Sequence, residues 1–287
     1  MKQLFELAQI TTSDGLTHEG LFAVPKRNAN IGIVWVHGLT SAFSHNAGLM
    51  QTLAQTATDA GYAYAVFNNR GHDMVDSEKR KDGTRYFIGG GFEKFTDCVK
   101  DIDATIRFMR SRGCKKVILI GHSTGANKIS YYLSRKPSAM VCGAVFAAGL
   151  TDVRPLDKKM RKLLAEATKV AEHNPSEILS YKKFDVFMNA QRYVSLFTPG
   201  GVEDTFPYHG YGGKWNILSR INVPVCVIIG DKDEHLSLPV HKYFTEIVGH
   251  LFSSPVVDAM EIKDASHSFK GKEKEFAKKI TNWIKQI

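Results

Sequence analysis

The sequence predicts an α/β fold in which a mostly parallel central sheet is flanked by helices and interrupted by an inserted helical lid. Short apolar runs typical of buried strands alternate with segments of helical periodicity through residues 1–150. The alternation stops over residues 151–220, where helical segments occur without a clear strand, and resumes over residues 221–287. We therefore expect residues 1–150 and 221–287 to form the two parts of one core, with residues 151–220 as the lid.

The expected strands follow one another in a regular order. Residues 4–11 and 16–24 flank Asp14-Gly15, a dipeptide that favours a hairpin. The later strands are runs of mainly apolar residues, expected at 31–36, 62–68, 116–121, 141–149, 223–230 and 256–262. Such runs are typical of strands that are covered on both faces of a parallel sheet.

The expected helices connect these strands and carry apolar residues at helical spacing. They are expected at residues 46–60, 92–112, 123–135, 239–250 and 270–287. Gly61, Gly113 and Pro137 lie just after the first three and are typical of helix ends. Strands that alternate with helices in this way are expected to be joined by right-handed crossovers.

Composition excludes several classes of function. The chain has 287 residues and a net charge of +9, but its lysines are scattered, and no basic stripe with interleaved aromatics indicates nucleic-acid binding. The cysteines are widely spaced without a C-x-x-C pair, so neither a zinc site nor a redox pair is expected. No signal peptide and no membrane-spanning run is evident, so we expect a cytoplasmic protein. The oligomeric state stays open.

The stretch from Gly121 to Gly125 reads G-H-S-T-G and lies between an expected strand and an expected helix. This G-x-S-x-G pattern in that context is typical of a sharp turn that exposes a nucleophilic serine. The N–H groups at the start of the following helix would face developing negative charge. We expect Ser123 to be the nucleophile, whereas the alternative is an ordinary helix cap.

A serine nucleophile needs a base and an acid, which follow it along the chain in this architecture. His267 follows the last expected strand and is the candidate base. Asp233 is the favoured acid, with Asp231 as the alternative, and Glu234 lies in the same loop. The expected oxyanion donors are the backbone N–H groups of Leu39 and Thr124.

Other polar and aromatic residues are candidates for the substrate pocket. His122 either lines the pocket or packs beneath it, and His37 is expected to tie down its loop by hydrogen bonds. Aromatic residues gather in the expected lid, and among them Tyr208 and Trp215 are the candidate pocket residues. Arg70 is expected to pair with Asp73 and fix a loop near the site, although binding of an anionic substrate group is the alternative.

These motifs resemble those of the α/β-hydrolase superfamily over essentially the whole chain from about residue 16. FNNRGHD (67–73), GHSTGANK (121–128) and SHSFKGKE (266–273) are similar to a branch of small, poorly characterised microbial serine hydrolases. That branch is distantly similar to siderophore-ester hydrolases. At the turn from Gly121 to Gly125 and at the loop around Gly38, it is also distantly similar to feruloyl-type carboxylesterases. The resemblance implies the α/β-hydrolase fold and hydrolase chemistry, and it leaves the substrate open.

The sequence thus predicts a serine esterase that acts on a small or medium-sized ester without a metal or a cofactor. The same residues serve thioester or amide hydrolysis and acyl transfer, so these activities remain alternatives. A non-catalytic protein that binds a small ligand in the same fold is the alternative from a different class.

Overall fold

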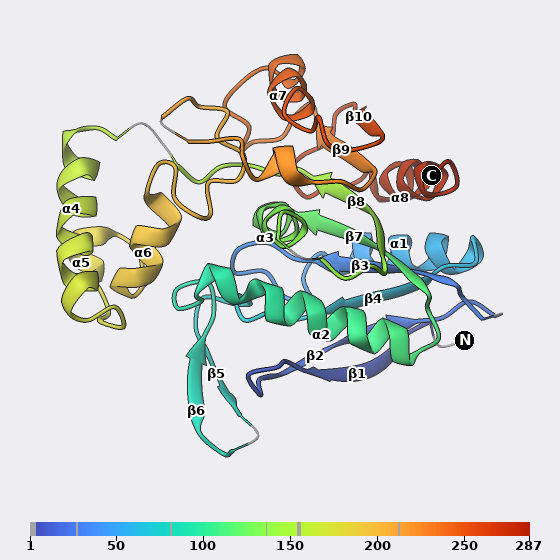
Figure 1. The fold of residues 1–287 in the computed structure, drawn as a ribbon, viewed down its shortest axis with the longest axis horizontal. Helices are drawn as coiled ribbons and strands as arrows, with labels where there is room; N and C mark the ends of the chain where they lie inside the picture. The colour runs from blue at the N-terminus through green and yellow to red at the C-terminus, as the bar shows by residue number, and fades with distance from the viewer. Residues whose placement is uncertain (1–3, 27, 81, 136, 154–155, 212) are drawn as a thin grey trace.

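The computed structural model describes residues 4–26, 28–80, 82–135, 137–153, 156–211 and 213–287. Within these residues, an eight-stranded sheet runs through the molecule in the order β1-β2-β4-β3-β7-β8-β9-β10 (Figure 1). Its strands are β1 Glu6–Thr11, β2 Thr17–Ala23, β3 Ile31–Val36, β4 Ala63–Phe67, β7 Lys116–His122, β8 Val141–Ala147, β9 Val225–Gly230 and β10 Val257–Ile262. The β1–β2 and β2–β4 pairs are antiparallel, and all later pairs are parallel. The predicted α/β class and mostly parallel sheet are confirmed.

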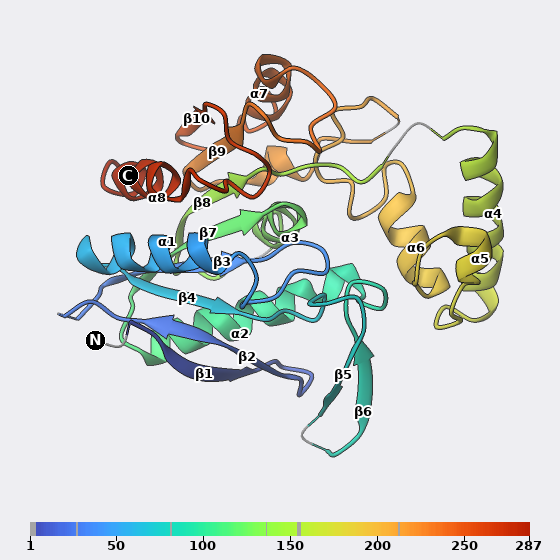
Figure 2. The same ribbon diagram turned by 180° about the vertical axis from the view of Figure 1, so that it is seen from behind.

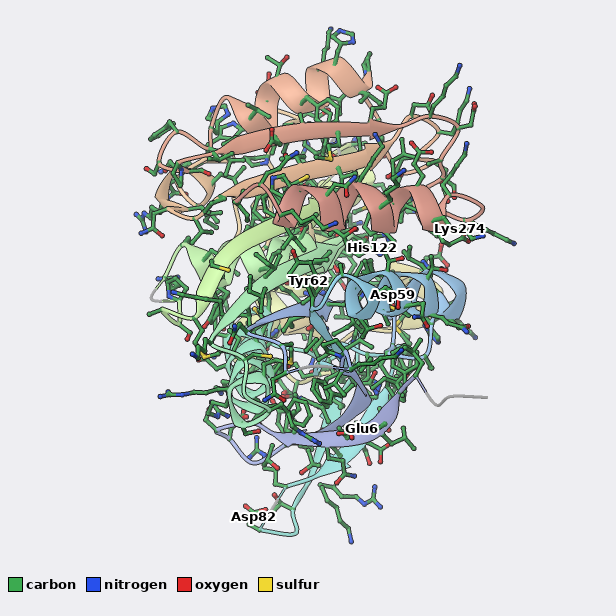
Figure 3. All side chains as sticks on the ribbon, turned by 90° about the vertical axis from the view of Figure 1, so that its right-hand side faces the viewer. Glu6, Asp59, Tyr62, Asp82, His122 and Lys274 are labelled. Atoms are coloured by element: carbon green, nitrogen blue, oxygen red, sulfur yellow. The ribbon has the colours of Figure 1, made fainter. Side chains whose placement is uncertain are left out.

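Helices cover both faces of this sheet. They are α1 Ala47–Asp59, α2 Cys98–Ser111, α3 Thr124–Leu133, α7 Val240–Val248 and α8 Glu273–Ile284. Figure 2 shows α1 and α8 on the face opposite to α2 and α3, and Figure 3 shows α8 next to α1, with Lys274 and Asp59 labelled on them. The apolar strand runs are buried between the two layers, as the sequence pattern predicts for parallel strands. No helix within the described residues is long and apolar enough to cross a membrane.

Residues 151–220 leave the sheet after β8 and return to it at β9. They contain α4 Lys158–His173, α5 Tyr181–Phe184, α6 Ala190–Phe197 and the short 3₁₀ helix η2 Leu218–Arg220. The helices α4, α5 and α6 gather at one side of the molecule (Figure 1), where they share a small apolar cluster that includes Leu163, Phe184 and Tyr193. These three helices therefore have an apolar cluster of their own, whereas Phe206 and Leu218 of the same segment belong to the core around the sheet.

A two-stranded hairpin that the sequence pattern does not predict, β5 Asp76–Lys79 and β6 Arg85–Ile88, protrudes from the molecule in Figure 1. Its residues are mostly polar and partly exposed, so no apolar run marks it. A tertiary contact holds its base, because Glu78 lies 3.0 Å from the Nδ1 of the buried His18 on β2. The helix expected from residue 92 begins later, with the 3₁₀ turn η1 Phe95–Asp97 followed by α2.

Candidate active site

The turn between β7 and α3 is as short as the sequence predicts. β7 ends at His122 and α3 begins at Thr124, so Ser123 alone makes the turn, with φ 55° and ψ −130°. A β-carbon on Gly121 would lie 2.3 Å from the Gly125 carbonyl oxygen, so only glycine fits there. A non-glycine residue at positive φ is strained, and the packed strand and helix around Ser123 hold it in that conformation.

The loop after β3 lies directly against this turn. A β-carbon placed on Gly38 would be 2.9 Å from the β-carbon of Ser123 and 3.3 Å from its Oγ. Leu39 follows Gly38, so its backbone belongs to the segment that faces the serine. Thr124 is the first residue of α3, and its backbone N–H has no acceptor within that helix.

Hydrogen bonds of His37 hold this loop in place. The backbone N–H of Asn69 donates to its Nε2 (3.1 Å), so the proton sits on Nδ1, which donates to the Gly38 carbonyl oxygen (3.0 Å). Burial, assisted by the nearby charge of Lys128, lowers the pKa of His37 well below its usual range. The imidazole therefore stays neutral and keeps one hydrogen-bond pattern.

The structure brings Asp233 and His267 together on the loops after β9 and β10. The Oδ2 of Asp233 lies 2.9 Å from the Nδ1 of His267, and its Oδ1 accepts the backbone N–H of His235 (2.9 Å). Glu234 plays a different part, because its carboxylate accepts the backbone N–H of His267 (2.9 Å), a hydrogen bond that lowers the pKa of Glu234. The backbone N–H of Asp231 donates to the backbone carbonyl of Ile262 (3.2 Å).

His122 links the serine turn to the His267 loop. Its Nε2–H donates to the backbone carbonyl of His267 (2.8 Å), and the two ring centroids lie 4.9 Å apart. The His122 ring also stacks on Trp35, with centroids 5.6 Å apart and planes 23° from parallel. Burial first, and the charge of His267 next, lower the pKa of His122 to about 4. A neutral His122, adjacent to Ser123, thus holds the loop that carries the candidate base.

The two aromatic candidates from residues 151–220 lie in different places. The hydroxyl of Tyr208 accepts the backbone N–H of Thr151 (3.3 Å), and burial above all, with Asp233 among the nearby charges, raises its pKa. Trp215 stacks flat on His250, which follows the C-terminal end of α7, with centroids 4.1 Å apart. The structure therefore does not bring Trp215 to the Ser123, Asp233 and His267 group.

A buried chain of charges joins residues 151–220 to the serine helix, and sequence reasoning missed it. The carboxylate of Glu93 lies 2.8 Å from the Nζ of Lys128 on α3 and 3.2 Å from a guanidinium nitrogen of Arg192 on α6. Arg192 also pairs with Glu203. All four side chains are at most 5% exposed. The sequence gives little signal for such a cluster, because charged residues are usually exposed.

This chain reaches the loop around Gly38. Lys128 Nζ donates to the Oδ1 of Asn69 (2.9 Å), and Asn69 is the residue whose backbone N–H binds His37. The buried charges therefore support the same histidine that orders the loop facing Ser123.

Arg70 does not pair with Asp73, which corrects the expectation from the sequence. Its guanidinium binds Asp101 on α2 (2.7 Å) and Asp14 (3.1 Å), and it is 2% exposed. Asp73 contacts His72 instead (2.7 Å). Arg70 is thus a structural residue that joins α2 to the hairpin turn between β1 and β2.

Among the described residues, no three His, Cys, Asp or Glu side chains are grouped so as to hold a metal ion.

Comparisons with known proteins show the family and the fold of the chain. The model of the family described as "Protein of unknown function (DUF1749)" matches residues 33–286. A search of curated proteins finds no match. Similar solved structures include a highly thermostable carboxyl esterase from Bacillus coagulans (TM-score 0.71, 12% identity, 100% of this chain and 99% of that chain).

Two further solved structures are similar along nearly the whole chain. One is a soluble variant of monoglyceride lipase from Saccharomyces cerevisiae (TM-score 0.68, 14% identity, 100% of this chain and 96% of that chain). The other is Est1E from Butyrivibrio proteoclasticus with bound ferulic acid (TM-score 0.64, 13% identity, 97% of this chain and 98% of that chain). The chain therefore belongs to the DUF1749 family, and its fold is that of the α/β-hydrolases.

Proposed function

We propose that the protein is a serine hydrolase that cleaves a carboxylic ester of a small or medium-sized substrate through an acyl-serine intermediate. The observation that carries this proposal is the link through His122. Its side chain holds the loop of His267, which binds Asp233, beside the strained turn of Ser123. The descriptions of the similar structures as a carboxyl esterase and a monoglyceride lipase agree with ester chemistry.

In the proposed mechanism, Asp233 holds His267 through its Nδ1–H, which leaves the Nε2 of His267 free to act as a base. His267 takes the proton of Ser123 as its Oγ attacks the ester carbonyl. The proton then passes to the leaving alcohol, and an acyl-serine remains. Water, activated by the same histidine, attacks the acyl group, and Ser123 recovers its proton as the acid leaves.

The negative charge on the carbonyl oxygen needs hydrogen-bond donors in both steps. We assign this role to the backbone N–H groups of Leu39 and Thr124, at the loop that packs against Ser123 and at the start of α3. The close approach of Gly38 to Ser123 supports this assignment, because Leu39 follows Gly38 directly and Thr124 follows Ser123 directly.

Residues 151–220 serve as a lid in this proposal, over a core formed by residues 1–150 and 221–287. Side chains from residues 196–204 lie beside Thr124, at a crevice between this segment and α3. Tyr208 is retained as a pocket residue, since it contacts Thr151 at the start of the same segment. The four cysteines are free, which fits the reducing cytoplasm that we propose as the compartment.

The experiment that tests the proposal is intact-mass analysis after exposure to a fluorophosphonate, followed by a panel of activated esters. We expect one adduct on the wild type and none on Ser123→Ala. Ser130→Ala, also on α3, is the matched control and is expected to keep the adduct. A folded wild type that gains no adduct and hydrolyses no ester would instead favour a non-catalytic ligand-binding protein.

A further inference from the structure

A narrow crevice borders Thr124 and separates α3 from the 151–220 segment, and it bears on which substrate the proposed esterase takes. Most of its wall is polar, and the polar residues are Thr124, Asn127, Thr151, Asp152, Glu203 and Asp204. Because the backbone N–H of Thr124 is the proposed oxyanion donor, a group in this crevice lies within a few bonds of the scissile carbonyl.

Two buried side chains present unpaired acceptors at this crevice. Thr124 is 7% exposed and Asn127 is 3% exposed, and neither the Oγ1 of Thr124 nor the Oδ1 of Asn127 has a hydrogen-bond partner in the part of the chain that the structure describes. The amide of Asn127 has a fixed orientation, because its Nδ2 donates to the backbone carbonyl of Glu203 (3.0 Å). Buried polar atoms are normally paired, so these two oxygens can accept hydrogen bonds from a bound molecule.

The charge of the crevice is negative. Among the described residues, Asp204 is 6% exposed and receives hydrogen bonds only from neutral donors, the hydroxyl of Thr151 (3.0 Å) and the backbone N–H of Gly200 (3.0 Å). The neighbouring Glu203 pairs with Arg192. Arg192 also pairs with Glu93, and Glu93 pairs with Lys128. Glu93 and Glu203 are thus balanced by Lys128 and Arg192, whereas among the described residues neither hydrogen bond of Asp204 comes from a cation, so its charge is not neutralised by them.

These features match one chemical group. A protonated primary amine carries three donors, no acceptor and one positive charge, which suits two unpaired acceptors beside an unneutralised carboxylate. A hydroxyl supplies only one donor and no charge. An alkyl chain would leave the two unpaired acceptors without partners and the Asp204 charge without a cation, which proteins avoid. The chain as a whole is basic, so this local negative site stands apart from its surroundings.

We infer that this crevice binds a protonated primary amine of the substrate and that the preferred substrates are esters with such an amine a few bonds from the scissile carbonyl. The inference rests on the proposed esterase function. Asp204 would supply the charge, and Thr124 and Asn127 would accept the remaining ammonium hydrogens. In this structure the crevice leaves no room for a water-sized group, so the amine enters only when the 151–220 segment shifts slightly away from α3. A bulky trimethylammonium, which also has no N–H donors, is not expected to replace it.

The test compares matched substrates at pH 7. The first series consists of nitrophenyl esters of hexanoate, 6-aminohexanoate and 6-(trimethylammonio)hexanoate. The second consists of propyl and 2-aminoethyl hexanoate, which carry the difference in the alcohol part. We expect kcat/KM to be at least about tenfold higher for the primary amine than for its neutral partner in one of the two series, and no such gain for the trimethylammonium ester.

Variants then locate the effect. Asp204→Asn and Thr124→Val, which keeps the backbone N–H, are each expected to lower the amine-to-neutral ratio several-fold. Asp59→Asn, the same chemical change on the exposed side of α1, is expected to keep the wild-type ratio. A wild type that hydrolyses hexanoate esters without preferring either amine would overturn the inference alone. A wild type that hydrolyses no ester and gains no fluorophosphonate adduct would overturn the proposed function with it.

Discussion

Glu93→Gln is the most informative test of the buried charge chain that links α3 and α6. Glu93 is fully buried at its side chain and faces Lys128 at 2.8 Å and Arg192 at 3.2 Å. Glutamine has nearly the same size, so the substitution removes the charge with little change in packing. It leaves two buried cations with Glu203 as the remaining carboxylate of the chain.

The expected loss of stability follows from these distances. With an effective dielectric constant of about 20, Coulomb attraction amounts to about 6 kcal/mol at 2.8 Å and about 5 kcal/mol at 3.2 Å. The burial of a carboxylate offsets several kcal/mol of this gain, and removal of one partner from a buried pair usually costs about 3–5 kcal/mol. We expect the free energy of unfolding to fall by that amount and the Tm to fall by about 10 °C.

Urea unfolding, followed by the fluorescence of the three tryptophans, measures this loss. Glu166→Gln is the matched control, because Glu166 pairs with Lys183 at the surface, where the two side chains are 37% and 48% exposed. That variant is expected to stay within about 0.5 kcal/mol of the wild type. A loss below about 1 kcal/mol for Glu93→Gln would refute the view that the buried charges hold α6 to α3.

Three further predictions concern the site and the hairpin. Gly38→Ala places a methyl group 2.9 Å from the β-carbon of Ser123, so we expect kcat for an activated ester to fall about 10²-fold. Asp233→Asn removes the charge that orients His267, and kcat is expected to fall about 10⁴-fold with little change in KM. Asp101 and Glu78, acting against burial, raise the pKa of His18 in the folded protein to about 9. The charged His18 therefore stabilises the fold fully below about pH 6.5, and this stabilisation disappears as the pH rises through 9. We expect His18→Gln to lower the free energy of unfolding more at pH 6 than at pH 9.5, as measured by urea unfolding.

Each of these predictions has a result that contradicts it. Wild-type kcat in Gly38→Ala would mean that the loop yields without moving the serine. For the acid, Asp231→Asn serves as the control and is expected to stay within a few-fold of the wild type. If the Asp231 variant lost activity while the Asp233 variant kept it, the assignment of the acid would be reversed. For His18→Gln, an unfolding difference from the wild type that is equal at pH 6 and pH 9.5 would rule out the expected linkage.

The sequence was sufficient for features that depend on local patterns. The apolar runs identify the strands of the parallel sheet, and the two glycines around Ser123 mark the turn. Ser123, Asp233 and His267 each follow an expected strand, in that order along the chain. In the structure, a hydrogen bond joins Asp233 to His267. The first two signals are carried by residues close together in sequence, and the third by the order of the strands along the chain.

Features that depend on distant partners were not predictable in this way. The sequence predicts that Arg70 pairs with Asp73, three residues away, whereas its partners include Asp101, thirty-one residues away, and Asp14, fifty-six residues away. Glu93 and Arg192 are ninety-nine residues apart, and each alone has the appearance of a surface charge. The aromatic residues of the expected lid predict a pocket role for Trp215, but its ring packs on His250, just after the C-terminal end of α7. Burial, which decides these cases, is a property of the complete fold.

The order of the strands also has a consequence for how the protein is made. His267 lies after β10, which pairs with β9, and α8 then packs on α1 from the beginning of the chain. A growing chain at the ribosome already carries Ser123 and the loop of Gly38 long before residue 267 is synthesised. The helix that closes over α1 is made after the other described helices and strands, so part of that face of the core stays uncovered until α8 is translated. Contacts between such distant segments slow folding, and we expect hydrolytic activity to emerge only after this late closure.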